Sequence, residues 1–302
     1  MKKLLFFFFL LLSASLFADS FTHNGLLRQY FKHIPKGYNA NKKVALLLLL
    51  HGGGGNGKRI GNFTGFNELS DKDTFIVVSP DAWQKHWNDG RTHPRYESQS
   101  NNIDDVGFLS ALIDTIMKHY NIDSKRVYAT GLSNGGMMSY RLACQLSGKI
   151  TAAVCVISNM PENLVSTCQP GKEMPIMIIN GDADPLMPFQ GGDVRFGKDT
   201  LGKVVSTDAT VKFWLNNNKC NLTAQRTSIP DISSLDNTTI VKDEYGGCSN
   251  NASVVLYTVK NGGHTYPGSR QYAPVRMIGQ TSQDMKAADV SWDFLKQYRN
   301  LY

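Results

Sequence analysis

The sequence lacks the cysteine and histidine patterns of metal-binding proteins. Its five cysteines all lie between residues 144 and 248, and none forms a C-x-x-C pair or a cluster with histidine. Zinc sites and redox-active sites depend on such spacing. The chain also has no G-x-x-x-x-G-K-[ST] phosphate loop. We therefore expect neither a metal ion nor an organic cofactor.

Runs of basic residues are also missing. The formal net charge is +7, but lysine and arginine are scattered along the chain. Nucleic-acid-binding proteins gather their positive charge into patches, so we expect no nucleic-acid partner. No internal repeat and no Pro-rich or Ser/Thr-rich linker divides the sequence, which favours one domain.

Only one long apolar run occurs, and it lies at the N-terminus. The stretch "MKKLLFFFFLLLSASLFA" has two lysines, an apolar core and then small residues. This order predicts a signal peptide over residues 1–18, cleaved after Ala18. An uncleaved anchor is the alternative, although a spanning helix needs roughly 20 apolar residues. We expect residues 19–302 to form a secreted or periplasmic protein that is not bound to a membrane after cleavage.

Export makes disulfide bonds possible. Cys155 lies inside the apolar run "TAAVCVIS" and is expected to be a buried free thiol. The remaining cysteines then favour the pairs Cys144–Cys168 and Cys220–Cys248. The second pair would close a loop of about 30 residues, which contributes roughly 3.5 kcal/mol in the chain-entropy model. It would bound a polar insertion near residues 219–250.

Apolar runs alternate with amphipathic stretches along the chain. This alternation predicts an α/β fold whose mostly parallel central sheet carries helices on both faces. The expected strands cover residues 44–51, 74–80, 126–133, 151–158, 174–181 and 253–260, and the expected helices cover 102–120, the stretch after 133, 208–217 and 281–298.

A candidate nucleophile lies where the strand expected over residues 126–133 meets the helix expected after it. Ser133 lies in the frame G-x-S-x-G, within "RVYATGLSNGGMMSYRLACQL". The pattern alone also fits an ordinary glycine-rich turn. A strand before the serine and a helix after it predict a nucleophile elbow, in which a sharp turn presents the hydroxyl.

A serine nucleophile needs a base, and in the α/β-hydrolase arrangement the order is serine, acid, histidine. Of the seven histidines only His264 follows Ser133. The acid should lie between them on a loop after a strand, where "NGDADPLMP" offers Asp182 and Asp184. The sequence pattern does not decide which of the two aspartates is the acid.

The oxyanion of an acyl-transfer intermediate needs backbone donors. The N–H of Asn134, directly after the serine, is one candidate. The loop "LHGGGGNG" supplies the other, and we expect it to be Gly53, because glycine lets the backbone approach a substrate closely.

Six motifs in this order resemble the polyhydroxybutyrate depolymerase-like esterases, which are similar to secreted feruloyl and acetylxylan esterases: "LHGGGGNG", "SPDAWQKHWNDGR", "DDVGFLSALID", "RVYATGLSNGGMMSYRLAC", "NGDADPLMPFQGG" and "GGHTYPG". The resemblance runs from about residue 24 to the C-terminus. It implies an α/β-hydrolase fold and a carboxylic-ester hydrolase.

The same resemblance implies residue roles. It selects Asp184 as the acid, because the family's acid precedes the first proline of D-P-x-x-P. It places Trp87 and Asn88, in the W-N-D-G-R motif, beside the substrate, with a purely structural loop as the alternative. Relatives often carry a cysteine where this chain has Gly53.

We therefore predict a serine esterase that acts through an acyl-enzyme on a small-molecule or oligomeric ester. A peptidase on the same fold and a secreted binding protein without catalysis are the alternatives.

Overall fold

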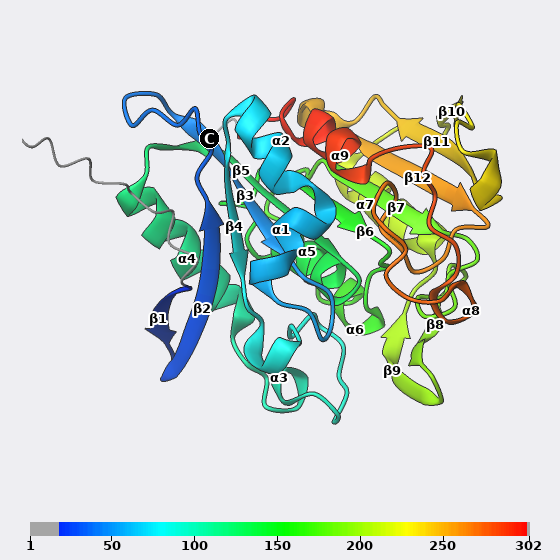
Figure 1. The fold of residues 1–302 in the computed structure, drawn as a ribbon, viewed down its shortest axis with the longest axis horizontal. Coiled ribbons are helices and arrows are strands. Elements are labelled where there is room, and N and C mark those ends of the chain that lie inside the picture. Colours follow the sequence, from blue (N-terminus) through cyan, green and yellow to red (C-terminus); the bar gives the residue numbers. More distant parts are fainter. Residues whose placement is uncertain (1–17, 301–302) are drawn as a thin grey trace, which may run out of the picture.

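Ten strands form one twisted sheet in the order β1-β2-β4-β3-β5-β6-β7-β12-β11-β10 (Figure 1). The structure is a computed structural model and describes residues 18–300, so residues 1–17 of the predicted signal peptide lie outside it. The strands are β1 (Asp19–His23), β2 (Leu26–His33), β3 (Val44–Leu50), β4 (Ile76–Pro80), β5 (Ile122–Leu132), β6 (Ala152–Val156), β7 (Ile176–Gly181), β10 (Gln225–Ile229), β11 (Thr239–Tyr245) and β12 (Val254–Lys260).

The six strands from β4 to β12 are parallel, and the strands outside them pair antiparallel. Every residue of β3 and β6 is buried. Continuous apolar runs such as "VALLLLL" give this result because helices cover both faces of the sheet. The carboxyl ends of parallel strands meet at one edge, so the loops after β3, β5, β7 and β12 gather there.

Two apolar cores fill the space between the sheet and its helices. The core on one face includes residues of α4, α5 and α7, and the core on the other includes residues of α1, α2 and α9 (Figure 1). The helices are α1 (Gly57–Thr64), α2 (Phe66–Asp73), α3 (Glu97–Ser100), α4 (Asp105–His119), α5 (Asn134–Gln145), α6 (Glu162–Val165), α7 (Thr207–Asn218), α8 (Val275–Ile278) and α9 (Ala287–Leu295).

The predicted fold class is confirmed, and its details differ at the edges. Strands β1, β2, β10 and β11 were not predicted, nor was the hairpin of β8 (Gly192–Phe196) and β9 (Asp199–Val204). The polar segment 219–250 does not stand apart from the domain, because β11 pairs with β12 and β10 pairs with β11 at the sheet edge. The helix expected over 281–298 begins only at Ala287.

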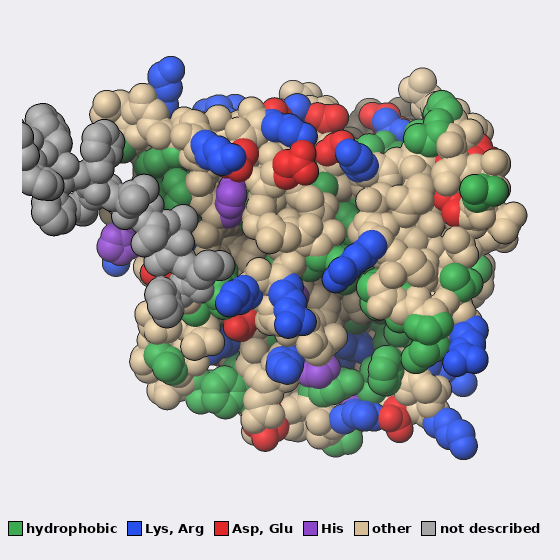
Figure 2. All heavy atoms as spheres, viewed as in Figure 1, with side chains coloured by type: hydrophobic (Ala, Val, Ile, Leu, Met, Phe, Trp, Pro, Cys, Tyr) green, Lys and Arg blue, Asp and Glu red, His purple; other side chains and the backbone are tan. Residues whose placement is uncertain are grey.

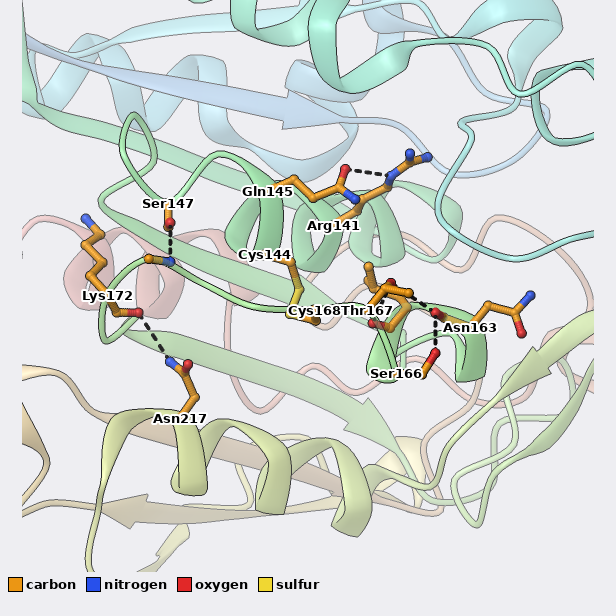
Figure 3. The surroundings of a disulfide bond; sticks show 12 residues. Arg141, Cys144, Gln145, Ser147, Asn163, Ser166, Thr167, Cys168, Lys172 and Asn217 are labelled. Carbon is orange, nitrogen blue, oxygen red and sulfur yellow. Dashed lines mark hydrogen bonds between the residues drawn. A yellow bond between two sulfur atoms is a disulfide. The ribbon is translucent and has the colours of Figure 1, made fainter.

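Two disulfide bonds join separate segments of the chain. Cys144 is bonded to Cys168 and Cys220 to Cys248, while Cys155 is a buried free thiol in β6. The first bond ties the end of α5 to the segment that follows α6 (Figure 3). The Ser147 hydroxyl accepts the Gly171 N–H at 2.9 Å on the same segment, so the end of α5 is held twice.

Across residues 18–300, none of the helices has the length and apolar character needed to cross a bilayer.

Candidate active site

Ser133 stands in a strained turn between β5 and α5. Its φ of 54° and ψ of −119° lie where non-glycine residues are rarely found, at a cost on the order of 1–3 kcal/mol. The turn is held from both sides: the Ser133 N–H donates to the Val156 carbonyl, and the Ser133 carbonyl accepts from the Met137 N–H, both at 2.9 Å. Strain that the surroundings maintain in this way is typical of functional turns.

The glycines around Ser133 are required by close backbone packing. A Cβ on Gly131 would collide with the carbonyl of Gly135, and a Cβ on Gly135 would collide with the carbonyls of Leu50 and His51. The G-x-S-x-G frame therefore lets β5, α5 and the end of β3 come together at the point where the serine is presented.

His264 and Asp184 form a buried pair. Nδ1 of His264 lies 2.7 Å from Oδ2 of Asp184, and their side chains are 7% and 2% exposed. The other carboxylate oxygen, Oδ1, accepts the N–H groups of Leu186 and Met187, each at 2.8 Å. Backbone donors thus fix the carboxylate, which in turn fixes the imidazole orientation.

The histidine loop is held by a tyrosine as well. The Tyr272 hydroxyl donates to the His264 carbonyl at 2.8 Å. Burial, and to a lesser extent the charge of Asp184, raises the pKa of Tyr272 to about 12, so the hydroxyl keeps its proton. Nε2 of His264 and the hydroxyl of Ser133 have no hydrogen-bond partner within residues 18–300, and both residues line one cleft.

Asp182, the other candidate acid, lies elsewhere. Its Oδ1 accepts the Asn261 N–H at 2.7 Å, and its Oδ2 lies 3.1 Å from Nζ of Lys260. It therefore joins the turns that follow β7 and β12 and makes no contact with the histidine.

Gly53 and Asn134 lie side by side. A Cβ built on Gly53 would be 3.8 Å from Cβ of Asn134 and 3.1 Å from Cδ2 of His86. The neighbours of Gly53 are anchored, since Gly54 N–H donates to Lys85 O and Gly55 N–H donates to Gly52 O, both at 2.9 Å. Asn134 begins α5, so its N–H has no carbonyl partner one turn earlier. Gly53 and the start of α5 are therefore neighbours at this edge of the sheet.

The side chain of Asn134 makes a network that sequence reasoning did not identify. Its Oδ1 accepts the Trp87 N–H at 2.7 Å, and its Nδ2 donates to Trp87 O at 3.1 Å and to Oδ2 of Asp89 at 2.6 Å. Asp89 is fully buried and also pairs with Arg91 at 2.7 Å. The nucleophile turn is thus attached to the loop of residues 87–91.

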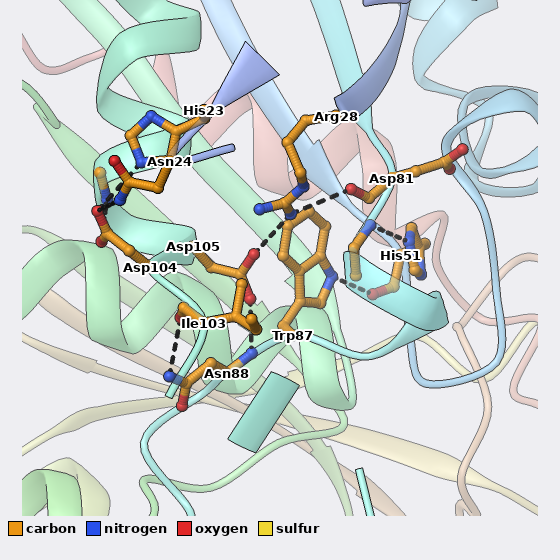
Figure 4. Close-up of polar contacts among 12 residues, drawn as sticks. His23, Asn24, Arg28, His51, Asp81, Trp87, Asn88, Ile103, Asp104 and Asp105 are labelled. Atoms are coloured by element: carbon orange, nitrogen blue, oxygen red, sulfur yellow. Dashed lines mark hydrogen bonds and ion pairs between the residues drawn. The ribbon is translucent and has the colours of Figure 1, made fainter. Parts of the chain in front are cut away.

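Trp87 and Asn88, which were predicted to border the substrate, are buried and do not line the cleft that contains Ser133 and His264. Trp87 is 0% exposed, and its indole N–H donates to the carbonyl of His51 at 2.9 Å (Figure 4). Asn88 is buried, and its amide donates to the carbonyl of Ile103 at 2.9 Å. Both residues support the loops beneath the cleft. The preceding residue, His86, lines the cleft instead.

His51 braces the glycine loop. Its Nε2 accepts the Ala82 N–H at 3.1 Å, and its Nδ1 lies 2.8 Å from the Gly52 carbonyl. Burial lowers the pKa of His51, so the neutral ring that these two bonds require is favoured. The ring joins the loop after β3 to the loop after β4.

The cleft that contains Ser133 and His264 has a volume of about 1590 Å³. Its apolar lining comes from α1, from the loops around the sheet edge and from the β8–β9 hairpin, and includes Phe63, Tyr96, Leu186, Phe196, Leu201 and Tyr272. The rings of His86 and Tyr96 are stacked with centroids 3.7 Å apart. No group of His, Cys, Asp and Glu in the described part of the chain could hold a metal ion.

Comparisons with known proteins agree with this architecture. Residues 38–200 match the phospholipase/carboxylesterase family. The putative esterase NocK of Nocardia uniformis subsp. tsuyamanensis is 28% identical over 284 residues, which cover 90% of this chain and 80% of that protein. The probable feruloyl esterase C of Aspergillus flavus is 30% identical over 244 residues, which cover 78% and 76%. The acetyl xylan esterase from Aspergillus awamori shares the fold, with a TM-score of 0.53, 14% identity and coverage of 80% of this chain and 92% of that one.

Proposed function

Because the chain belongs to the phospholipase/carboxylesterase family, we propose that it hydrolyses carboxylic esters through an acyl-enzyme on Ser133. An esterase of the α/β-hydrolase type, related to feruloyl esterases, is the class that follows from family and fold. The observation that carries the serine mechanism is the buried Asp184–His264 pair, whose histidine lines one cleft together with a serine held in a strained turn.

In the first half-reaction the Ser133 hydroxyl attacks the ester carbonyl. Nε2 of His264 accepts the serine proton, while Asp184 holds the ring by Nδ1 and stabilises the imidazolium. The N–H groups of Gly53 and Asn134 bind the oxyanion. His264 then protonates the departing alcohol. Water, deprotonated by the same imidazole, attacks the acyl-serine and releases the acid.

Ser133→Ala tests the nucleophile. Hydrolysis of p-nitrophenyl acetate should fall by a factor on the order of 10⁴ or more, with Ser228→Ala, an exposed hydroxyl on β10, as the matched control. A fluorophosphonate should label wild-type protein on the peptide that contains Ser133 and leave Ser133→Ala unlabelled. Turnover in the alanine variant close to that of the wild type would exclude the assignment.

For the substrate we propose aryl and short-chain esters, including hydroxycinnamoyl esters. Two observations support this class: relatives named feruloyl esterase, and a cleft with aromatic side chains such as Tyr96, Phe196 and Tyr272. A panel of p-nitrophenyl esters of rising chain length, methyl ferulate, acetylated xylan and hydroxybutyrate oligomers separates this class from a polyhydroxybutyrate depolymerase. Turnover of hydroxybutyrate oligomers alone would contradict the proposal.

We also propose that the protein acts outside the cytoplasm, after removal of residues 1–18. Two disulfide bonds support export, because such bonds persist in oxidising compartments. N-terminal sequencing of exported protein should begin at Asp19, and recovery of intact chain only from the cytosol would refute the idea.

A further inference from the structure

The cleft is lined by an excess of positive charge. Eight of its lining residues are lysine or arginine, and only Glu68 and Asp289 are acidic. The whole chain has a formal net charge of +7. Positive charge is therefore concentrated around the cleft although it is scattered in the sequence. Figure 2 shows Lys and Arg side chains around a hollow on this face of the molecule.

Some of these cations already have partners. Arg91 pairs with Asp89, Arg95 with Asp199 and Lys72 with Glu68. The other five, Lys58, Arg59, Arg195, Arg270 and Lys286, form no ion pair within residues 18–300. All five are exposed to solvent.

Four of the unpaired cations lie along one side of the cleft, and we call Lys58, Arg59, Arg270 and Lys286 the basic bank. Lys58 and Arg59 are in the first turn of α1, directly after the glycine loop. The ring of Phe63, also in α1, lies 6.0 Å from the ring of Tyr272, so α1 adjoins the histidine loop that carries Arg270.

The start of α9 completes the bank. A Cβ on Gly268 would lie 3.2 Å from Cγ of Lys286. The helix and the histidine loop are therefore in direct contact there. The same loop carries His264, so the bank lies on the wall of the cleft that holds the proposed base.

We propose that the basic bank binds a carboxylate on the substrate, so that the enzyme prefers esters that carry an organic anion over matched neutral esters. The proposal rests on the ester hydrolysis proposed above and changes none of its bonds. The substrate carboxylate is bound, not consumed, and remains on the released acid or alcohol. Unpaired cations around a cleft raise the local concentration of an anionic substrate, and salt weakens this effect.

Two pairs of substrates test the preference and locate the anion. In the first pair the acyl part differs: mono-p-nitrophenyl glutarate is compared with its neutral methyl ester. In the second pair the alcohol part differs: p-acetoxybenzoate is compared with methyl p-acetoxybenzoate. Each rate is divided by the uncatalysed rate of the same ester. We expect kcat/KM to be roughly five- to twentyfold higher for the anion in at least one pair, and the ratio to approach one between about 0.02 M and 0.5 M NaCl.

The variant Arg59→Gln/Lys286→Gln should lower the anion-to-neutral ratio roughly four- to ninefold, because each exposed contact contributes only about two- to threefold. Arg59→Lys/Lys286→Arg keeps both charges and should restore the ratio. Lys42→Gln removes an exposed cation outside the cleft and should leave the ratio unchanged.

The outcomes separate this proposal from the one on which it rests. If the wild type hydrolyses the neutral esters, Ser133→Ala does not, and the anion-to-neutral ratio is near one in both pairs, only the charge preference is overturned. A ratio that both double variants lower equally would also overturn it, since shape and not charge would then be responsible. Failure to hydrolyse any of the four esters would overturn the proposed function itself.

Discussion

Replacement of Asn134 by aspartate tests how far the nucleophile turn depends on the loop beneath it. The side chain is 3% exposed and makes three hydrogen bonds, two with the backbone of Trp87 and one with the fully buried Asp89. Asn134→Asp keeps the shape of the side chain, but an ionised carboxyl has no N–H to donate. It would also place a second carboxylate where a donor now lies 2.6 Å from Oδ2 of Asp89.

The expected loss follows from these contacts. Leaving the buried Trp87 carbonyl without a donor costs about 1–3 kcal/mol, and facing buried carboxylates add a comparable amount. We expect a loss of about 3–5 kcal/mol in the free energy of unfolding at pH 8, out of the 5–15 kcal/mol of a typical domain. At pH 5 the introduced carboxyl should be protonated in the folded protein, because two carboxylates so close cannot both ionise. Its O–H then donates to Asp89, and the loss should shrink to about 1–2 kcal/mol.

The stability of the variant should change with pH in the opposite direction to that expected for an ordinary acidic residue. The folded state of the variant binds a proton that the unfolded state releases, so its stability falls as the pH rises. Urea unfolding of wild type and variant at pH 5 and pH 8 measures this difference. Asn41→Asp makes the same chemical change at an exposed site and should have little effect at either pH. Equal stability of Asn134→Asp and wild type at pH 8, or a loss independent of pH, would refute the reasoning.

Three further predictions concern the same edge of the sheet. Gly53→Ala would place a Cβ 3.1 Å from the ring of His86, so the ring or the loop must give by a few tenths of an ångström. We expect the loop to move and kcat for p-nitrophenyl acetate to fall by about 10²–10³, as on loss of an oxyanion donor; an unchanged kcat would argue against that donor. Ser133→Gly should be more stable than Ser133→Ala by about 1–2 kcal/mol in urea unfolding, because glycine relieves the strain at a φ of 54°, and the usual order, alanine above glycine, would show that the turn is unstrained. Burial lowers the pKa of His51 in the folded state, so stability should fall as the pH drops below about 6.5; thermal unfolding of His51→Gln should show less of this fall, and an identical pH profile would contradict the assignment.

The centre of the fold could be predicted from the sequence, and its edges could not. Continuous apolar runs such as "VALLLLL" leave few alternatives to a strand covered on both faces. The β10 strand "QRTSI" is mostly exposed and short, so its only support is pairing with β11, which no local pattern reveals. The β8–β9 hairpin, which contributes Phe196 to the cleft, was missed for the same reason.

The candidate site divides along similar lines. Chain order and the ends of the strands predicted Ser133, His264 and two possible acids. The structure brings one of these acids, Asp184, into contact with His264. The sequence could not place Trp87, because an aromatic residue in a polar motif fits a cleft wall and a buried support equally well. Its position depends on a hydrogen bond to His51, which is distant in the sequence. His86 and the amide of Asn134 could be assigned only from the folded structure.

The free thiol in β6 constrains how the chain reaches its native disulfide bonds. Cys155 lies between Cys144 and Cys168 in the sequence, 11 and 13 residues away, whereas the native pair spans 24. Shorter loops close more readily in an unfolded chain, by roughly threefold for a halved length. Either wrong pair would therefore form first if oxidation preceded collapse. Packing of β6 between its neighbouring strands before the thiols of α5 and the α6 segment meet would remove Cys155 from this competition.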